Sequence, residues 1–240
     1  MTSTAITLGT LYGVGVGPGD PELITVKAFR MLKECPVIAY PKKRMGAKSY
    51  ALEIVELYVD TSGKEMLGLV FPMTKDRATL DQEWSKTVDA CWRHLQAGKD
   101  IAFVTEGDPN LYSTFIHMAR LMQEVHPEVP VRSVPGISSV LGAAARLDLP
   151  LADGDEQVAI VPANGDRQAM KLAIEAHDAI VFIKVAKVLD MMIEILEELN
   201  LTEKASVVTK VTSPQELIWR DVRELKGQEL EYLTLMVVRK

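Results

Sequence analysis

The chain has 240 residues, of which 48% are hydrophobic and 25% are charged. These proportions are typical of a folded globular protein and exclude a disordered chain, a collagen-like repeat and a small disulfide-bonded scaffold. The 27 basic and 33 acidic side chains give a formal net charge of -6. This acidity argues against non-specific nucleic-acid binding, which needs a broad excess of basic residues.

The cysteine content and the start of the sequence indicate a cytoplasmic protein. Two thiols, Cys35 and Cys91, provide no disulfide framework and suit a reducing compartment. The first ten residues lack the basic segment and the long apolar run of a signal peptide. No window of the sequence has the ~20 successive apolar residues that a membrane span needs. We therefore expect a cytoplasmic protein without a membrane partner.

The first half of the chain alternates predicted strands with predicted helices. Strands are expected at residues 11–16, 37–40, 67–71, 101–105 and 131–134, and helices at 21–35, 47–58, 77–96, 110–125 and from 137 onward. Asp20 and Pro21 suit the N-cap and the first position of the first helix, and Pro36 ends it. Because such alternation is typical of right-handed β-α-β units, we expect a mainly parallel sheet.

After Pro150 the predicted strands follow one another more closely. Strands are expected at residues 158–161, 179–183, 205–209, 217–222 and 232–238, with an amphipathic helix at 185–199. The last two strands are separated only by residues 223–231, which suggests a hairpin-like antiparallel pair. We therefore predict two α/β domains, residues 1–137 with a mainly parallel sheet and residues 138–240 with a mixed sheet.

Four glycines, at positions 13, 15, 17 and 19, lie between the first strand and the first helix. They do not fit the dinucleotide fingerprint Gly-x-Gly-x-x-Gly, because its third glycine falls on Pro18 or Asp20, and no P-loop occurs. A tight turn alone requires fewer glycines. We therefore expect the backbone to approach a ligand closely here.

Two further loops share this character. Gly107-Asp108-Pro109 repeats the Gly19-Asp20-Pro21 arrangement, with each Asp predicted to cap a helix, and residues 135–139 form a third loop of small residues. Loops that follow parallel strands gather at one edge of the sheet, where ligands of open α/β folds bind. The three loops together therefore predict a site that offers backbone N–H and C=O groups to a polar ligand.

The three loops, in this order, resemble the signatures of the tetrapyrrole methylases. The segments concerned are Val-Gly-Val-Gly-Pro-Gly-Asp at 14–20, Glu-Gly-Asp-Pro at 106–109 and Val-Pro-Gly-Ile-Ser-Ser at 134–139. The family comprises S-adenosylmethionine-dependent enzymes of cobalamin and siroheme synthesis, and the resemblance covers essentially the whole chain. Three more segments, at 40–42, 71–76 and 105–114, are most similar to its precorrin-2 (cobalt-factor II) C20-methyltransferases.

This resemblance implies two α/β domains, a homodimer and S-adenosylmethionine held in a cleft between the domains. The positions that it implies near the methyl donor are Pro18, Gly107, Asp108, Leu111, Ser138, Ser139, Ile183 and Val211. Methyl transfer from a sulfonium needs positioning and exclusion of water, so no protein-bound metal is expected. No catalytic residue is assigned, because the Tyr-Asp-Arg of the siroheme-forming relative is replaced here by Tyr40-Pro41-Lys42.

The tetrapyrrole implied by the resemblance, precorrin-2 or cobalt-factor II, is a polycarboxylate. An acidic enzyme needs a local basic patch to attract it, and Lys42, Lys43 and Arg44, beside Tyr40, are the candidate substrate-binding residues. The same basic run is equally consistent with a solvated surface.

Two other functions fit the sequence. One is a methyltransferase similar to diphthine synthase, whose acceptor is a modified histidine on a protein, and the other is a non-catalytic nucleotide-binding module. Cys91 and His94 lie one helical turn apart but lack the further ligands of a zinc site.

Overall fold

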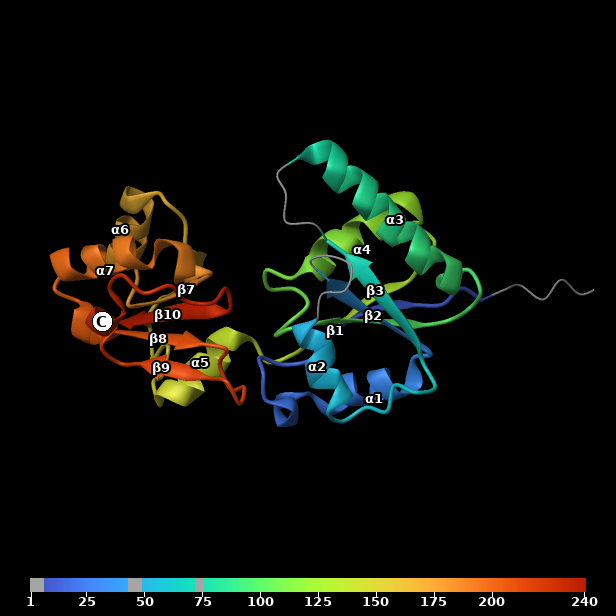
Figure 1. The fold of residues 1–240 in the computed structure, drawn as a ribbon, viewed down its shortest axis with the longest axis horizontal. Coiled ribbons are helices and arrows are strands. Elements are labelled where there is room, and N and C mark those ends of the chain that lie inside the picture. Colours follow the sequence, from blue (N-terminus) through green and yellow to red (C-terminus); the bar gives the residue numbers. More distant parts are fainter. Residues whose placement is uncertain (1–6, 43–48, 72–75) are drawn as a thin grey trace, which may run out of the picture. The chain divides into compact units, whose positions relative to one another are not determined.

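A computed structural model describes residues 7–42, 49–71 and 76–240. The chain divides into two compact units, Met1–Ser138 and Ser139–Lys240, which we call the N-terminal and the C-terminal unit. Each unit has its own sheet and its own helices (Figure 1).

The N-terminal sheet consists of five strands in the order β3-β2-β4-β1-β5, and all four pairings are parallel. Its strands are β1 (Leu11–Gly15), β2 (Val37–Lys42), β3 (Glu65–Val70), β4 (Ile101–Thr105) and β5 (Val131–Val134). The central strand β4 is buried at every position, as expected for a parallel strand that is covered on both faces. The predicted parallel sheet is confirmed.

Helices cover both faces of this sheet (Figure 1). They are α1 (Val26–Glu34), α2 (Tyr50–Glu56), α3 (Arg77–Leu95) and α4 (Thr114–Val125). On one face, Leu32 of α1 and Ile54 of α2 pack with Val104 of the sheet. On the other face, Val88 of α3 and Met118 of α4 pack in a second cluster. This two-sided burial is what places the ends of the strands, rather than their faces, within reach of ligands.

The single helix predicted at 21–35 is wrong. A short 3₁₀ helix, Pro21–Leu23, follows Asp20, whose carboxylate accepts a hydrogen bond from the N–H of Glu22 at 2.8 Å. The chain is then extended at Ile24, and α1 begins only after Thr25, whose hydroxyl accepts from the N–H of Ala28 at 3.1 Å. Thr25 offers a second N-cap, so two short helical segments replace one long helix.

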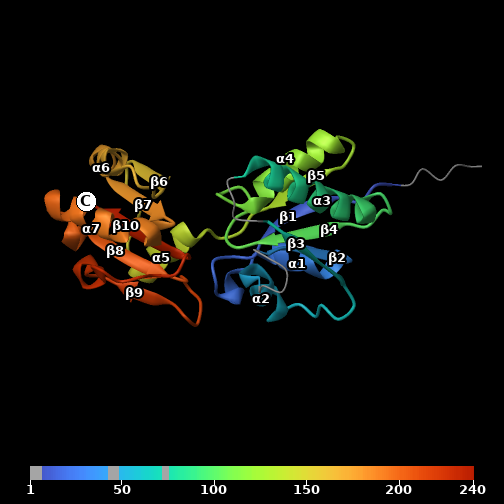
Figure 2. The same ribbon diagram turned by 45° about the horizontal axis from the view of Figure 1, so that its top comes forward.

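The C-terminal unit contains a mixed sheet in the order β6-β7-β10-β8-β9, with β6 and β7 parallel and the other pairs antiparallel. Its elements are α5 (Ser139–Leu147), β6 (Val158–Pro162), α6 (Arg167–Ala176), β7 (Ala179–Ile183), α7 (Leu189–Glu198), β8 (Ala205–Thr209), β9 (Leu217–Trp219) and β10 (Thr234–Arg239). Helices α6 and α7 pack on one face of this sheet, while α5 contacts β10 (Figure 2). The predicted mixed sheet is confirmed.

The predicted hairpin of the last two strands is wrong, because β8 lies between β9 and β10. The connection between them contains a 3₁₀ helix, Val222–Leu225, whose two terminal residues are buried in the core. β10 is buried from Thr234 to Val238 and therefore needs a neighbour on both sides, whereas the short, partly exposed β9 suits an edge.

Among the helices of the described ranges, none combines the length and the apolar character that a membrane span requires.

Candidate functional site

The loops that follow β1, β4 and β5 meet at one edge of the N-terminal sheet. The three strands are parallel neighbours, so their carboxyl ends share that edge. The N–H of Gly107, in the loop after β4, donates to the carbonyl of Gly17, in the loop after β1, at 2.8 Å. This hydrogen bond joins two of the three loops singled out in the sequence.

Three glycines cross where these loops meet. A Cβ on Gly136 would lie 2.1 Å from the carbonyl oxygen of Gly107, and a Cβ on Gly15 would lie 2.5 Å from the same oxygen. Gly107 itself has φ 63, a left-handed conformation that side chains disfavour. The crossing therefore admits only backbone.

Asp108 ties the second loop to the third. One carboxylate oxygen accepts from the N–H of Asn110 at 2.8 Å, and the other accepts from the N–H of Gly136 at 3.1 Å. The prediction that Asp108 caps the following helix is wrong: α4 begins at Thr114, and its N-cap is Ser113. Because the carboxylate accepts these two N–H groups, Asp108 holds the loops in place.

A pair of buried hydroxyls closes the base of the loop after β4. The hydroxyl oxygens of Thr105 and Ser113 lie 2.9 Å apart, and Ser113 also accepts from the N–H of Phe115 at 3.1 Å. At the outer end of the loop, Ser133 on β5 donates to the side-chain oxygen of Asn110 at 3.1 Å. The loop is thus fixed at its base and at its tip.

The N-terminal unit brings together five of the residues expected near the donor. Pro18 and Gly107 are buried at the crossing, whereas Asp108, Leu111 and Ser138 are partly exposed in the loops around it. Their contact with a methyl donor stays a prediction.

The end of β2 presents one of the predicted basic residues. The ammonium of Lys42 lies 4.9 Å from the ring centroid of Tyr40, within cation-π range, and Tyr40 is 8% exposed. On the neighbouring strand, a Cβ at Gly68 would lie 2.6 Å from Cε of Lys42. The Lys42 side chain therefore passes over Gly68, with its ammonium beside the Tyr40 ring. Sequence reasoning missed Gly68, because a glycine in a strand carries no sign of the side chain that crosses it.

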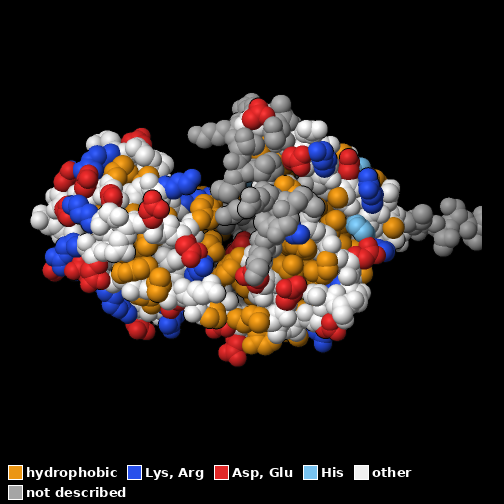
Figure 3. Space-filling model, viewed as in Figure 1, with side chains coloured by type: hydrophobic (Ala, Val, Ile, Leu, Met, Phe, Trp, Pro, Cys, Tyr) orange, Lys and Arg blue, Asp and Glu red, His pale blue; other side chains and the backbone are white. Residues whose placement is uncertain are grey.

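The rest of the predicted basic run, Lys43 and Arg44, lies outside the described residues, as do residues 72–75. On the face drawn in Figure 3, basic and acidic side chains are interspersed over each unit. This distribution agrees with the acidic net charge of -6.

The C-terminal unit holds the other three residues expected near the donor. Ser139 is the first residue of α5, Ile183 ends β7 and Val211 follows β8. β7 and β8 are both antiparallel to β10, so their carboxyl ends share one edge of this sheet. Val211 is buried, with 4% of the residue exposed, and its contact with a methyl donor stays a prediction.

The same edge carries unusual backbone conformations. Lys184, Lys210 and Thr212 have positive φ values of 60, 46 and 64 degrees. Such conformations are costly for residues other than glycine and concentrate at functional sites. The carboxyl edge of the C-terminal sheet is therefore a candidate ligand-binding edge of this unit.

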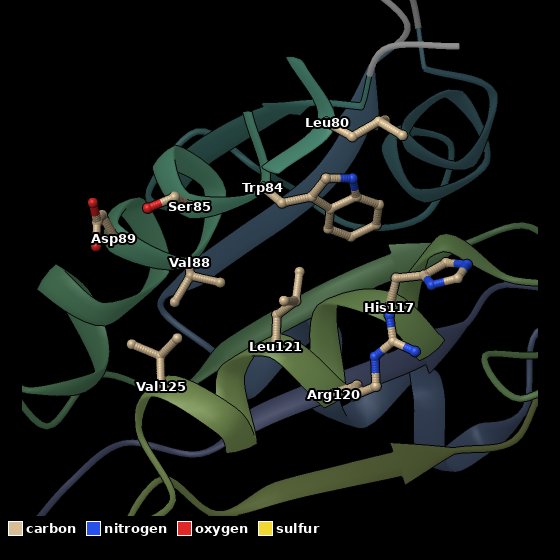
Figure 4. A pocket seen from close by; sticks show the side chains of 9 residues that line it. All are labelled: Leu80, Trp84, Ser85, Val88, Asp89, His117, Arg120, Leu121 and Val125. Atoms are coloured by element: carbon tan, nitrogen blue, oxygen red, sulfur yellow. The ribbon is translucent and has the colours of Figure 1, made fainter. Parts of the chain in front are cut away.

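A cavity of about 630 Å³ lies apart from these loops, between α3 and α4 (Figure 4). Trp84, Val88 and Leu121 give it an apolar lining, with His117 and Arg120 at one end. Of the described residues that are predicted to bind donor or substrate, none lines it.

The two thiols offer no reactive group at neutral pH. Burial raises the pKa of both Cys35 and Cys91 to about 12, so each thiol stays protonated and unreactive at neutral pH. Nδ1 of His94 lies 3.0 Å from a carboxylate oxygen of Glu65. Within the described part of the chain, no group of three or more His, Cys, Asp or Glu residues is arranged to hold a metal ion.

Comparison with known proteins agrees with this geometry. The sequence profile of the tetrapyrrole (corrin/porphyrin) methylases matches residues 10–226. A probable cobalt-precorrin-2 C(20)-methyltransferase of Methanocaldococcus jannaschii is 38% identical over 198 residues, which cover 82% of this chain and 76% of the relative. The cobalt-precorrin-2 C(20)-methyltransferase of Salmonella typhimurium is 32% identical over 97% of both chains.

Solved structures share the fold. A cobalt precorrin-4 methyltransferase has a TM-score of 0.71 at 23% identity and covers 96% of this chain and 94% of its own. A uroporphyrin-III C-methyl transferase from Thermus thermophilus, complexed with S-adenosyl homocysteine, has a TM-score of 0.68 at 24% identity, over 97% of this chain and 98% of its own. Because the family profile matches residues 10–226, the chain belongs to the tetrapyrrole (corrin/porphyrin) methylase family.

Proposed function

We propose that this protein transfers a methyl group from S-adenosylmethionine to C20 of precorrin-2 or cobalt-factor II in cobalamin biosynthesis. The observation that carries the proposal is the similarity to a cobalt-precorrin-2 C(20)-methyltransferase that extends over 97% of both chains at 32% identity. A match of that extent includes both units, with their loops and strand ends, rather than one shared motif.

The loops of the N-terminal unit suit the methyl donor. When bound, the donor supplies an electrophilic methyl group on a positively charged sulfur. The crossing of Gly15, Gly107 and Gly136 is built of main chain and includes the carbonyl oxygen of Gly107. Carbonyl oxygens favour a positive charge without offering a competing nucleophile. We assign donor contacts in this unit to Pro18, Gly107, Asp108, Leu111 and Ser138, and in the C-terminal unit to Ser139, Ile183 and Val211.

The tetrapyrrole is assigned to the end of β2. Its carboxylates would pair with Lys42, whose ammonium is already oriented by Tyr40, and with Lys43 and Arg44. Replacing Lys42, Lys43 and Arg44 together with Gln is expected to raise the tetrapyrrole KM by about tenfold or more, because each lost charge-assisted contact contributes about 1.5–3 kcal/mol. The Kd of S-adenosylhomocysteine is expected to stay unchanged, and an unchanged tetrapyrrole KM would remove these residues from the substrate site.

The reaction itself is tested by incubation with labelled donor and, in separate reactions, precorrin-2, cobalt-factor II and elongation factor. The proposal expects a tetrapyrrole whose mass and NMR spectrum show one new methyl group at C20. Label in the elongation factor alone would indicate the diphthine synthase type of reaction. Absence of donor binding at tens of micromolar would indicate a non-catalytic module.

We also propose that the protein acts as a cytoplasmic homodimer without a metal of its own and without nucleic-acid or membrane partners. The family resemblance supports the dimer, and the acidic net charge of -6 agrees with the lack of a nucleic-acid partner. Light scattering after size exclusion gives the mass of the assembly, and metal analysis of the purified chain tests the metal content. A monomer at micromolar concentration, or stoichiometric metal, would contradict the corresponding part.

A further inference from the structure

Two glycines of β1 face the same side of the N-terminal sheet. Side chains alternate along a strand, so positions 13 and 15 point to one face and Val14 points to the other. Leu11, which shares the face of Gly13, accordingly belongs to the core cluster under α3 and α4, whereas Val14 belongs to the cluster under α1 and α2. β1 therefore presents two positions without a side chain, Gly13 and Gly15, to the face that α4 covers.

The ring of Phe115 occupies the space beside Gly13. A Cβ added at Gly13 would lie 2.2 Å from Cε1 and 2.3 Å from Cδ1 of Phe115, far inside ordinary contact distance. Phe103, the register partner of Gly13 on β4, packs on the same ring with 5.7 Å between centroids. Phe115 is 2% exposed and Phe103 is fully buried, so the ring has little room to move aside. Among the amino acids, glycine alone allows the ring to lie this close to the main chain of β1.

The loop after β4 also contacts Gly15, at its other end. The carbonyl oxygen of Gly107, near the start of the loop, would lie 2.5 Å from a Cβ at Gly15. Phe115 follows the end of the loop, and its N–H donates to the hydroxyl of Ser113 at 3.1 Å. That hydroxyl lies 2.9 Å from the hydroxyl of Thr105, at the end of β4. The loop is therefore held against the glycine side of β1 at two points, and a displacement of Phe115 reaches it through Ser113.

The contact at Gly15 leaves the loop no space to move closer to β1. If a side chain at position 13 displaced the Phe115 ring by about 1 Å or more, to ordinary contact distance, the end of the loop would have to move away from the strand. The hydrogen bond from the N–H of Gly107 to the carbonyl of Gly17, at 2.8 Å, would then be strained or lost. Gly107 is among the residues that we assign to the methyl donor.

We propose that Phe115 is a positioning residue for the methyl donor, whose ring, packed on Gly13, sets the place of the donor-binding loop after β4. The proposal rests on the proposed function, because it takes the ligand of this loop to be S-adenosylmethionine. Gly13 then serves the approach of an aromatic ring of this chain, while Gly15 serves the approach of the loop itself.

The first test is Gly13→Ala, titrated calorimetrically with S-adenosylhomocysteine. Because the Cβ displaces the ring and with it the loop, the Kd is expected to rise about tenfold or more. Tm is expected to fall by about 2–12 °C, as overpacking of a core in a chain of this size implies.

The second test is compensation by a smaller side chain at position 115. Phe115→Leu leaves part of the space beside Gly13 empty and is expected to raise the Kd about threefold to tenfold by itself. In the double variant, Gly13→Ala with Phe115→Leu, the new Cβ fills part of that space. The Kd is then expected to stay within about threefold of wild type, whereas independent effects would multiply to about thirtyfold or more.

Met122→Ala is the matched control for a general loss of stability. Met122 lies about two turns further along α4 and is fully buried in the same core cluster as Phe115. Its truncation is expected to lower Tm by about 4–20 °C, at least as much as Gly13→Ala. The Kd of S-adenosylhomocysteine is expected to stay within about twofold of wild type, because Met122 does not adjoin the loop.

The inference is overturned if Gly13→Ala leaves the Kd within about twofold of wild type, or if Met122→Ala raises the Kd as much as Gly13→Ala does. A double variant whose Kd equals the product of the two single effects overturns it as well. If Gly13→Ala does not fold, the double variant decides. A folded double variant that binds no more weakly than Phe115→Leu supports the inference, and one that binds more weakly or does not fold overturns it.

Binding of S-adenosylhomocysteine needs no turnover, so the test is separate from that of the proposed reaction. Wild-type protein that binds it without methylating precorrin-2 or cobalt-factor II would refute the proposed reaction, while the Kd ratios still decide the role of Phe115. Wild-type protein that does not bind it at tens of micromolar would refute both.

Discussion

The close crossing of the loops at Gly15, Gly107 and Gly136 predicts that Gly136→Ala lowers stability and weakens binding of S-adenosylhomocysteine. The added Cβ would lie 2.1 Å from the carbonyl oxygen of Gly107 and 2.8 Å from the Cα of Gly15. Both obstacles are backbone atoms, so the contact cannot be relieved by rotating a side chain. One of the loops has to move by about 1 Å or more to reach ordinary contact distance.

The cost follows from two terms. Overpacking of this kind costs about 1–3 kcal/mol. Displacement of the third loop also breaks the hydrogen bond from the N–H of Gly136 to Asp108, at 3.1 Å, which contributes about 1.5–3 kcal/mol because its acceptor is charged. Together these terms lower the free energy of unfolding by about 2.5–6 kcal/mol, against a stability of about 5–15 kcal/mol for a typical domain. The fold is therefore expected to survive with displaced loops.

The assays are urea unfolding and calorimetric titration with S-adenosylhomocysteine. We expect a lower midpoint in urea and a Kd that rises more than about tenfold. Gly63→Ala is the matched control, since a Cβ there would meet nothing within 4 Å, and it is expected to change neither quantity appreciably. A Gly136→Ala variant with wild-type midpoint and wild-type Kd would refute the reasoning that the crossing excludes side chains and shapes the donor site.

Two further predictions concern Lys42 and the thiols. Gly68→Ala places a Cβ 2.6 Å from Cε and 2.7 Å from Nζ of Lys42. Because the flexible end of the Lys42 side chain can move away, steady-state kinetics should show a higher tetrapyrrole KM, with kcat unchanged and Tm nearly unchanged. An unchanged KM would contradict the role of Lys42. Cys35 and Cys91 should not react with Ellman's reagent at pH 8 in the native protein but should both react in urea. Because burial raises the pKa of both thiols to about 12, the thiols lose their protons at a lower pH in the unfolded state than in the native state. The free energy of unfolding should therefore fall as pH rises from 9 towards 12. Replacement of both residues by Ala should reduce that fall, and an unchanged dependence on pH would exclude the thiols as its cause.

The elements with strong local patterns were predictable. The apolar run of β4, the glycine-rich turn after β1 and the long α3 follow from residues that lie next to each other in the chain. α6 was not predicted, although Asp166 caps it with a hydrogen bond to the N–H of Ala169 at 3.0 Å, and Met170 and Ile174 are its buried stripe. The cap and the apolar stripe that indicate α6 are present in the sequence, but the helix has only 10 residues.

The roles of individual side chains were less predictable than the elements that carry them. Asp20 and Asp108 stand in the same Gly-Asp-Pro context, yet Asp20 caps a 3₁₀ helix whereas Asp108 bonds to Gly136. A local pattern cannot distinguish these outcomes, because the partner of Asp108 is supplied by another loop.

The sequence by itself determined the parallel character of the first sheet, the mixed character of the second and the loops on which a site would be built. These features depend on hydrophobic runs and turn residues that act over a few positions. Only the tertiary structure decided that β8 separates β9 from β10, that Asp108 accepts from an N–H 28 positions away, and that Lys42 crosses Gly68. The physical reason is that strand order and side-chain partners are selected by burial and hydrogen bonding among distant segments, which a local pattern does not encode.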